Sequence, residues 1–294
     1  MMIKEGINGF CMALADSVPG VSGGTVAYIM GFYNQFIGAI HNVVFGNRKE
    51  KKEALTYLVK LGIGWILGMG IAVIALSSLF ESHIYTVSSL FFGFIIGAIP
   101  LIVLEEREDF KKVKEGILWG MIGILFVVLL TWLNGRMGSN TMDLGKFTLG
   151  LGIRLFLIGM FAISAMFLPG ISGSTMLLIF GAYMPVIAAV KGVLAFDLSY
   201  FPCLIFFGCG ILTGAVTVVK AIKVCMEKFH AQTVYTIVGM MVGSLYAIVM
   251  GPTTLKIQQP PLSFREFRMI PALLGVALVL GMQMIKEKRA NKMQ

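Results

Sequence analysis

Two copies of one short motif carry the groups best suited to bind an anion. The first copy runs from Pro19 to Thr25 and the second from Pro169 to Thr175. Proline removes a backbone donor and glycine permits unusual turns, so each copy predicts a break in its helix. A helix restarting after the break presents unpaired N–H groups and the positive end of its dipole. The candidate substrate-binding residues are Pro19, Gly20, Ser22, Gly23, Gly24 and Thr25, with Pro169, Gly170, Ser172, Gly173, Ser174 and Thr175.

Two basic residues complete the predicted anion site. Arg154 lies in the apolar stretch before the second motif, and Lys4 occupies the equivalent place before the first. A cation from each half, aimed at one head group, suits a phosphate, which arginine binds in bidentate fashion. Two alternatives stay open: Lys4 as a terminal charge that sets membrane topology, and Arg154 as a side chain that extends to the outer interface.

Five ionisable residues are candidates for coupling transport to an ion. Asp16 directly precedes the first motif, and its counterpart in the second half is Met166. Asp16 could carry a proton, pair with a basic residue, or cap a half-helix starting near Ser17 or Pro19. The other four are Glu81, His83, Glu227 and His230, at matching places in the halves, with purely interfacial charges as the alternative.

The elements that hold these residues are apolar. Hydrophobic residues make up 57% of the 294 residues and charged residues 13%, so lipid must surround most of the chain. Six stretches are long enough to cross a membrane: 61–80, 84–104, 116–135, 198–219, 231–250 and 269–285. The stretches around the motifs are interrupted or too short. We therefore expect re-entrant helical hairpins over 6–40 and 147–190.

The chain is a tandem duplication. Eight of fifteen positions are identical between 19–33 and 169–183, and the glycines of the following spans also correspond. Those glycines predict close helix packing: Gly62, Gly64, Gly68, Gly208, Gly210 and Gly214. The predicted repeats are 1–145 and 146–294. The predicted fold class is an all-α polytopic membrane protein of two repeats, each a re-entrant hairpin followed by three transmembrane helices.

Three spans between the motifs, an odd number, would turn the second repeat upside down relative to the first. Placing the termini, 48–53, 105–115 and 220–228 in the cytoplasm puts sixteen Lys and Arg residues on that side, and six on the other. Positive charge marks the cytoplasmic side. We expect a multi-pass protein of the bacterial cytoplasmic (inner) membrane, with both termini cytoplasmic.

Other classes of function fit the sequence less well. The net charge of +9 resides in short loops between apolar spans, so no nucleic-acid partner is expected. The four cysteines lack metal-type spacing, and no metal or cofactor is expected. A lipid phosphatase with Ser22 or Ser172 as nucleophile was considered. No histidine or carboxylate pair lies near either serine in sequence, so we expect no enzyme.

The segment from Ala15 to Thr25, paired with the segment from Leu168 to Thr175, resembles the bacterial undecaprenyl-phosphate (polyprenyl-phosphate) translocase family typified by PopT. The resemblance runs over essentially the whole chain. It implies a flippase that returns undecaprenyl phosphate from the outer to the cytoplasmic leaflet for reuse in cell-envelope synthesis. The alternative is a channel or ion-coupled transporter for a small anion. Expected partners are the polyprenyl-phosphate lipid, membrane lipids, and protons or sodium ions for coupling; a homo-oligomer is left open.

Overall fold

The computed structural model describes residues 2–16, 22–71, 77–110, 113–136, 142–254 and 259–291, and all regular elements among them are helical. The first half contains α1 (Met2–Asp16), α2 (Gly23–Ile29), α3 (Tyr33–Phe45), α4 (Arg48–Ile71), α5 (Ser77–Glu105), α6 (Arg107–Phe110) and α7 (Val113–Arg136). The second contains α8 (Leu149–Phe167), α9 (Gly173–Ile179), α10 (Tyr183–Leu194), α11 (Phe201–Lys228), α12 (His230–Met250) and α13 (Met269–Asn291), with short 3-10 turns at Leu198–Tyr200 and Gly251–Thr254.

Among the described residues, six helices are long and apolar enough to cross a membrane, and they overlap most of the predicted spans. They are Arg48–Ile71, His83–Glu105, Gly116–Leu133, Leu149–Phe167, Leu198–Lys228 and His230–Thr253. Three differences stand out. The helix expected over 61–80 begins at Arg48, and α8 has the length of a full span although its sequence was assigned to a hairpin. The apolar part of α13, Met269–Gly281, is shorter than a span.

Both predicted breaks are present, and a second break follows each of them. α1 ends at Asp16 before α2 begins at Gly23, and α8 ends at Phe167 before α9 begins at Gly173. α2 and α9 then stop after seven residues. A glycine with positive φ follows each, Gly31 at 71° and Gly181 at 66°, a conformation that other residues rarely adopt. The α9–α10 pair is bent by 105°, which fits either a broken span or a re-entrant loop.

Matched glycine contacts hold equivalent helices together in the two halves. Gly64 of α4 lies against the backbone of Gly6 in α1, and Gly210 of α11 lies against the backbone of Phe156 in α8. Gly68 and Gly214 repeat the pattern one turn later, so close packing is confirmed at these four glycines. The prediction is wrong for two others, since a side chain at Gly62 or Gly208 would meet open space.

The two halves are interleaved rather than set side by side. The most extensive contacts between the two halves join α7 to α12 and α5 to α13. Gly93 of α5 packs on Ala272 of α13, and Gly239 of α12 packs on Gly120 of α7. The last long helix of each half is therefore exchanged onto the other half.

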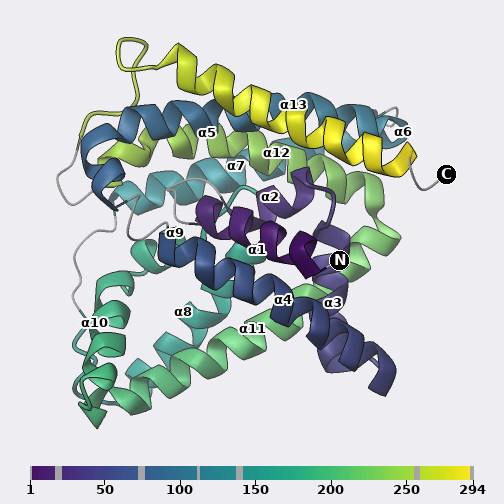
Figure 1. Cartoon of the computed structure of the whole chain (residues 1–294). Coiled ribbons are helices and arrows are strands. Elements are labelled where there is room, and N and C mark those ends of the chain that lie inside the picture. The colour runs from purple at the N-terminus through teal and green to yellow at the C-terminus, as the bar shows by residue number, and fades with distance from the viewer. Residues whose placement is uncertain are drawn as a thin grey trace.

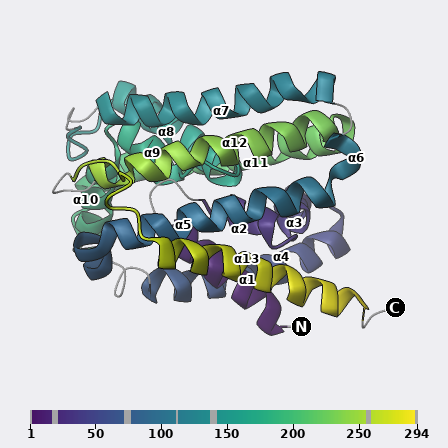
Figure 2. The ribbon, with the colours of Figure 1, turned by 90° about the horizontal axis from the view of Figure 1, so that it is seen from above.

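Figures 1 and 2 show the consequence for the shape. α5, α7, α12 and α13 lie roughly parallel, and α1 to α4 and α8 to α11 cover one side of this group. Both chain ends lie at the end of the bundle that carries α6, while α10 lies at the opposite end in both views.

Candidate functional site

The two broken segments meet inside the protein. The Gly170 backbone N–H, in the second break, donates to the Thr25 hydroxyl of α2 at 2.7 Å. The Ser22 hydroxyl donates to the Leu168 carbonyl at 3.3 Å, and the Tyr33 hydroxyl donates to the Phe167 carbonyl at 3.0 Å. The two motifs are therefore joined by direct hydrogen bonds.

The hydroxyls of Ser22 and Thr25 use their hydrogen-bonding capacity within the protein. Both side chains are fully buried, and their oxygens lie 3.1 Å apart. Ser22 also accepts from the Thr25 backbone N–H at 3.2 Å, which caps α2. Since the single hydroxyl hydrogen of Ser22 is directed to Leu168, the Thr25 hydroxyl must donate to Ser22 while accepting from Gly170. These two side chains hold the segments together rather than facing an open space.

Asp16 caps the amino-terminal end of α2. Its carboxylate accepts from the Gly23 backbone N–H at 2.7 Å and from the Trp65 indole N–H at 2.9 Å. A carboxylate at this place satisfies a free helix donor and complements the helix dipole. Of the three roles considered for Asp16, the geometry supports capping, at Gly23 rather than near Ser17 or Pro19. Pro19 and Gly20 of the first motif lie outside the described residues.

The second break lacks this internal anion. Met166 replaces the aspartate, and its Cβ lies beside Gly173 just as the Asp16 carboxylate lies beside Gly23. Ser172 makes no capping bond to α9, and its hydroxyl lies 2.7 Å from that of Ser174. Gly170 has a φ of 88° and packs against the backbone of Met240 in α12. Within the described chain, the start of α9 thus receives no side-chain acceptor like the one at α2.

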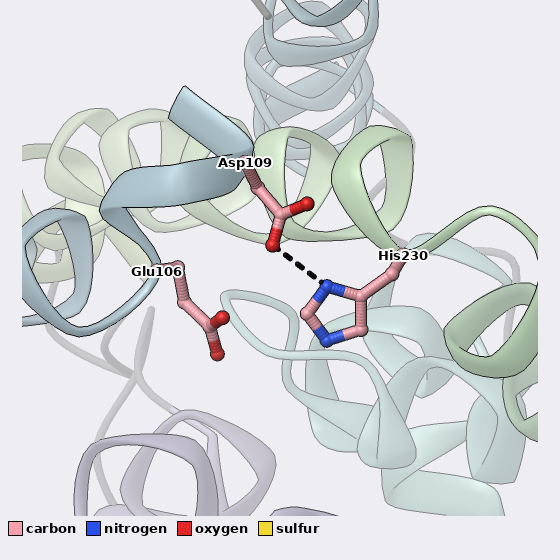
Figure 3. Close-up of side chains that lie close together, drawn as sticks. All are labelled: Glu106, Asp109 and His230. Carbon is pink, nitrogen blue, oxygen red and sulfur yellow. Dashed lines mark hydrogen bonds and ion pairs between the residues drawn. The ribbon is translucent and has the colours of Figure 1, made fainter. Parts of the chain in front are cut away.

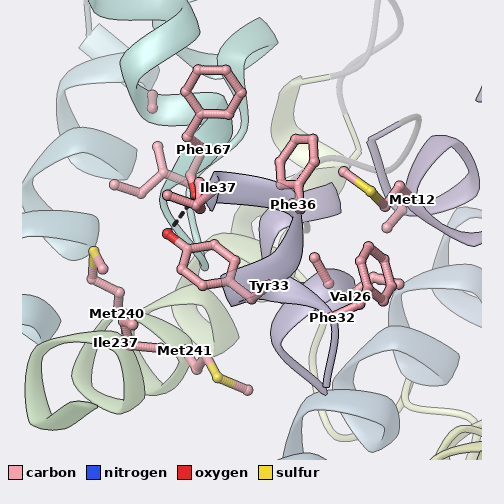
Figure 4. Close-up of a cluster of buried hydrophobic side chains, with 14 of the residues drawn as sticks. Met12, Val26, Phe32, Tyr33, Phe36, Ile37, Phe167, Ile237, Met240 and Met241 are labelled. Carbon is pink, nitrogen blue, oxygen red and sulfur yellow. Dashed lines mark hydrogen bonds between the residues drawn. The ribbon is translucent and has the colours of Figure 1, made fainter. Parts of the chain in front are cut away.

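A cluster of apolar side chains supports the meeting point (Figure 4). Phe36 of α3 packs edge-on against Phe167, with ring centroids 5.8 Å apart. Gly24 lies so close to the Phe167 carbonyl that an added Cβ would come within 2.9 Å of it. The labelled members of the cluster are Met12, Val26, Phe32, Tyr33, Phe36, Ile37, Phe167, Ile237, Met240 and Met241. The junction between the halves is therefore tightly packed and positions both breaks.

Lys4 and Arg154 lie far from the breaks along their helices. Both are exposed, near the starts of α1 and α8, whose other ends carry the motifs. At about 1.5 Å per residue, Arg154 lies about 20 Å along α8 from Phe167. The start of α8 adjoins the start of α11, because Gly152 lies against Phe206. The structure therefore does not bring either cation to the junction.

The four remaining coupling candidates lie at the ends of spans. His83 is exposed and has non-helical dihedrals inside α5, so the span proper begins there, as α12 begins at His230. Glu227 is exposed and lies 4.0 Å from Lys223. His230 lies 2.9 Å from the Asp109 carboxylate. The Glu81 side chain lies outside what the structure describes.

Sequence reasoning missed three polar side chains that matter here: Tyr33, Trp65 and Asp109. Tyr33 carried a signal, because Tyr183 matches it in the repeat. Trp65 and Asp109 act through contacts with residues 49 and 121 positions away, which no local pattern indicates.

These features define a multi-pass membrane protein built on a duplicated unit whose two broken helices meet in the interior. A family model described as undecaprenyl phosphate translocase-like matches residues 12–263. The chain belongs to this family, and the resemblance drawn from the doubled motif is confirmed.

Two relatives extend the comparison. A polyprenyl-phosphate transporter of Staphylococcus aureus is 34% identical over 250 residues, which cover 84% of this chain and 86% of the relative. A polyprenyl-phosphate transporter of Vibrio cholerae is 29% identical over 315 aligned positions, covering 96% of each chain. No solved structure matches the chain significantly.

Proposed function

We propose that this chain is a flippase for polyprenyl phosphate, and that it returns undecaprenyl phosphate from the outer to the cytoplasmic leaflet. The observation that carries the proposal is the direct meeting of the two breaks, in a chain whose relatives are named polyprenyl-phosphate transporters. Moving the phosphate through hydrocarbon is the costly part of flipping, because a charge loses its hydration there. The prenyl tail can stay in lipid throughout.

The phosphate is held at the junction, and chiefly at the second break. The start of α2 already has an anion in Asp16, whereas the start of α9 has Met166 at the equivalent place. Hydroxyls of Ser172, Ser174 and Thr175 accompany the N–H groups of α9, and such groups favour phosphate. In this arrangement the first break orders the junction and the second binds the head group.

Lys4 and Arg154 contact the head group before it enters the junction and after it leaves. Their exposed places near the starts of α1 and α8 suit capture of an anionic head group near the membrane surface. This assignment changes their role from contacts at the junction to contacts on the way to it, since the helix length separates them from the breaks.

The proposed topology places the two repeats in opposite orientations, with re-entrant segments at each break. The bend of 105° between α9 and α10 and the shared end for both termini support it. The basic residues of the loops support a cytoplasmic location for that shared end. Protons or sodium ions stay the candidates for coupling.

The test is transport in liposomes containing a polyprenyl phosphate, with a reagent that reaches the lipid in one leaflet only. The purified protein is expected to make the inner-leaflet pool accessible, and Arg154→Ala is expected to lower the rate several-fold, about 1 kcal/mol of interaction. Lys146→Ala, a basic residue in the preceding loop, is the matched control.

Three outcomes would contradict parts of this proposal. Unchanged movement with Arg154→Ala removes Arg154 from the path. No movement by the native protein under any ion gradient counts against lipid transport itself. Flux of inorganic phosphate or another small anion, without lipid movement, would favour the channel or secondary-transporter alternative.

A further inference from the structure

Three side chains with metal-binding atoms converge where the first half meets α12. Glu106 follows α5, Asp109 lies in α6, and His230 is the first residue of α12. One ligand atom from each lies within 4.8 Å of the other two. Figure 3 shows both carboxylates directed toward the imidazole from the same side of the α12 start. All three residues are half-buried, and Asp109 is 2.9 Å from the His230 Nδ1 atom.

A buried hydroxyl beside this cluster points to a missing polar ligand. The Tyr28 oxygen is buried and has no hydrogen-bond partner in the described part of the chain. The charges that act most strongly on it are those of Glu106, Glu105 and Asp109. Buried polar groups without a partner are rare, and an unseen ion or water is a common reason. Tyr28 lies near the end of α2, the helix that follows the first break.

A cavity adjoins the cluster at His230. A partly open cavity of about 220 Å³ shares His230 as a wall and is otherwise lined by α3 and α11, including Asn34 and Lys223. The Lys223 ammonium there is paired with Glu227 at 4.0 Å and with the His41 ring at 3.4 Å. The side of His230 facing Glu106 and Asp109 carries two carboxylates, which favour a cation.

We propose that Glu106, Asp109 and His230 bind a divalent transition-metal ion, Mn²⁺ or Zn²⁺. Two carboxylates neutralise the ion, and an imidazole ligand favours these metals over Mg²⁺ and Ca²⁺, which prefer oxygen ligands only. Ligand atoms at about 2.1 Å from the metal lie at most about 4.2 Å apart, so small side-chain rotations close the site. The Nδ1 atom of His230 would then bind the ion instead of hydrogen-bonding to Asp109. Water molecules would complete the coordination of the ion.

The metal would fasten α6 to α12. These elements come from different halves, and they lie at the end of the bundle that carries both termini. The site needs no transported lipid, so its test is independent of the proposed transport function.

The test uses the full-length protein, purified in detergent and treated with EDTA. Titration with Mn²⁺, followed by the electron paramagnetic resonance signal of the free ion, is expected to reveal one saturable site per chain. Zn²⁺ is expected to compete for it, and the bound ion should raise the Tm. Glu106→Gln and His230→Gln are each expected to weaken binding about tenfold or more. Glu108→Gln is the matched control, because this carboxylate lies in α6 but is exposed beside Arg107.

Two readouts guard against misfolding. Each variant must elute from gel filtration as the parent protein does, and Asp109→Asn, which keeps a hydrogen-bonding group beside His230, must also weaken binding. Equal affinity in the parent and in the Glu106→Gln/His230→Gln double variant would overturn the site. Absence of saturable Mn²⁺ or Zn²⁺ binding to the parent protein would overturn it as well.

Discussion

The two breaks have matching sequences, but they differ in which group lies at the start of the helix that follows each break. At the first break, Asp16 bonds the start of α2 and is itself held by Trp65. At the second, Met166 stands in the same place beside Gly173 and offers no acceptor. One break carries its own anion, and the other does not. In the proposed function the first break is therefore structural and the second binds the head group.

Giving the second break an internal anion should have the largest effect. Met166→Asp is expected to place a carboxylate at the start of α9, where it would replace the phosphate. Charge-assisted hydrogen bonds contribute about 1.5–3 kcal/mol, so head-group binding should weaken roughly 100-fold. Transport in liposomes and phosphate-lipid binding both measure this. Met166→Leu, which keeps the volume, should behave as the parent protein; full activity of Met166→Asp would remove α9 from the binding site.

Removing the hydrogen bond between the two breaks should have the next largest effect. Thr25→Val keeps the shape but leaves the buried Gly170 N–H without its acceptor. The expected loss of stability is about 1–3 kcal/mol, because an unpaired buried donor keeps its full desolvation cost. Thermal unfolding in detergent measures it, with Thr175→Val as the equivalent change in the second half. Equal stability of the two variants would show that the bond to Gly170 contributes nothing.

Removing the charge of the first break should have the smallest effect. Asp16→Asn retains an oxygen that can accept from Gly23, but its NH2 group cannot accept from the Trp65 indole, and the favourable interaction with the helix dipole is lost. A loss of about 1–2 kcal/mol in stability is expected, with transport largely retained. Abolished transport in a stable Asp16→Asn protein would contradict the capping role and support a proton carried by Asp16.

The sequence predicted the framework of the site better than its contents. Matching glycines located the duplication, and the packing at Gly64 and Gly210 follows because a missing side chain permits close backbone approach. Proline and glycine located the breaks, since they affect the backbone locally. Gly62 and Gly208 show the limit of this reasoning, because a glycine pattern alone does not tell which face of the helix has a neighbour.

Long-range partners were beyond sequence reasoning. Hydropathy indicates that a segment is apolar, but it does not indicate which helix the segment packs on. The packing of α7 on α12 and of α13 on α5 was therefore not predicted. Asp109 lies in the stretch 105–115, for which the sequence predicted only a cytoplasmic location, yet it contacts His230, 121 residues away. Arg154 was grouped with the motif by its position in an apolar stretch, although helix geometry carries it to the far end of α8.

The interleaving of the halves also bears on how the protein is made. The glycine face of α5 at Gly93 is covered by α13, the last helix to be synthesised, and α7 must likewise wait for α12. During translation these faces have only lipid as a neighbour, so the first half cannot complete its fold by itself. Two fragments divided in the connection before α8 would each be incomplete, and would regain the native packing only when produced together. The second half therefore serves as the folding partner of the first.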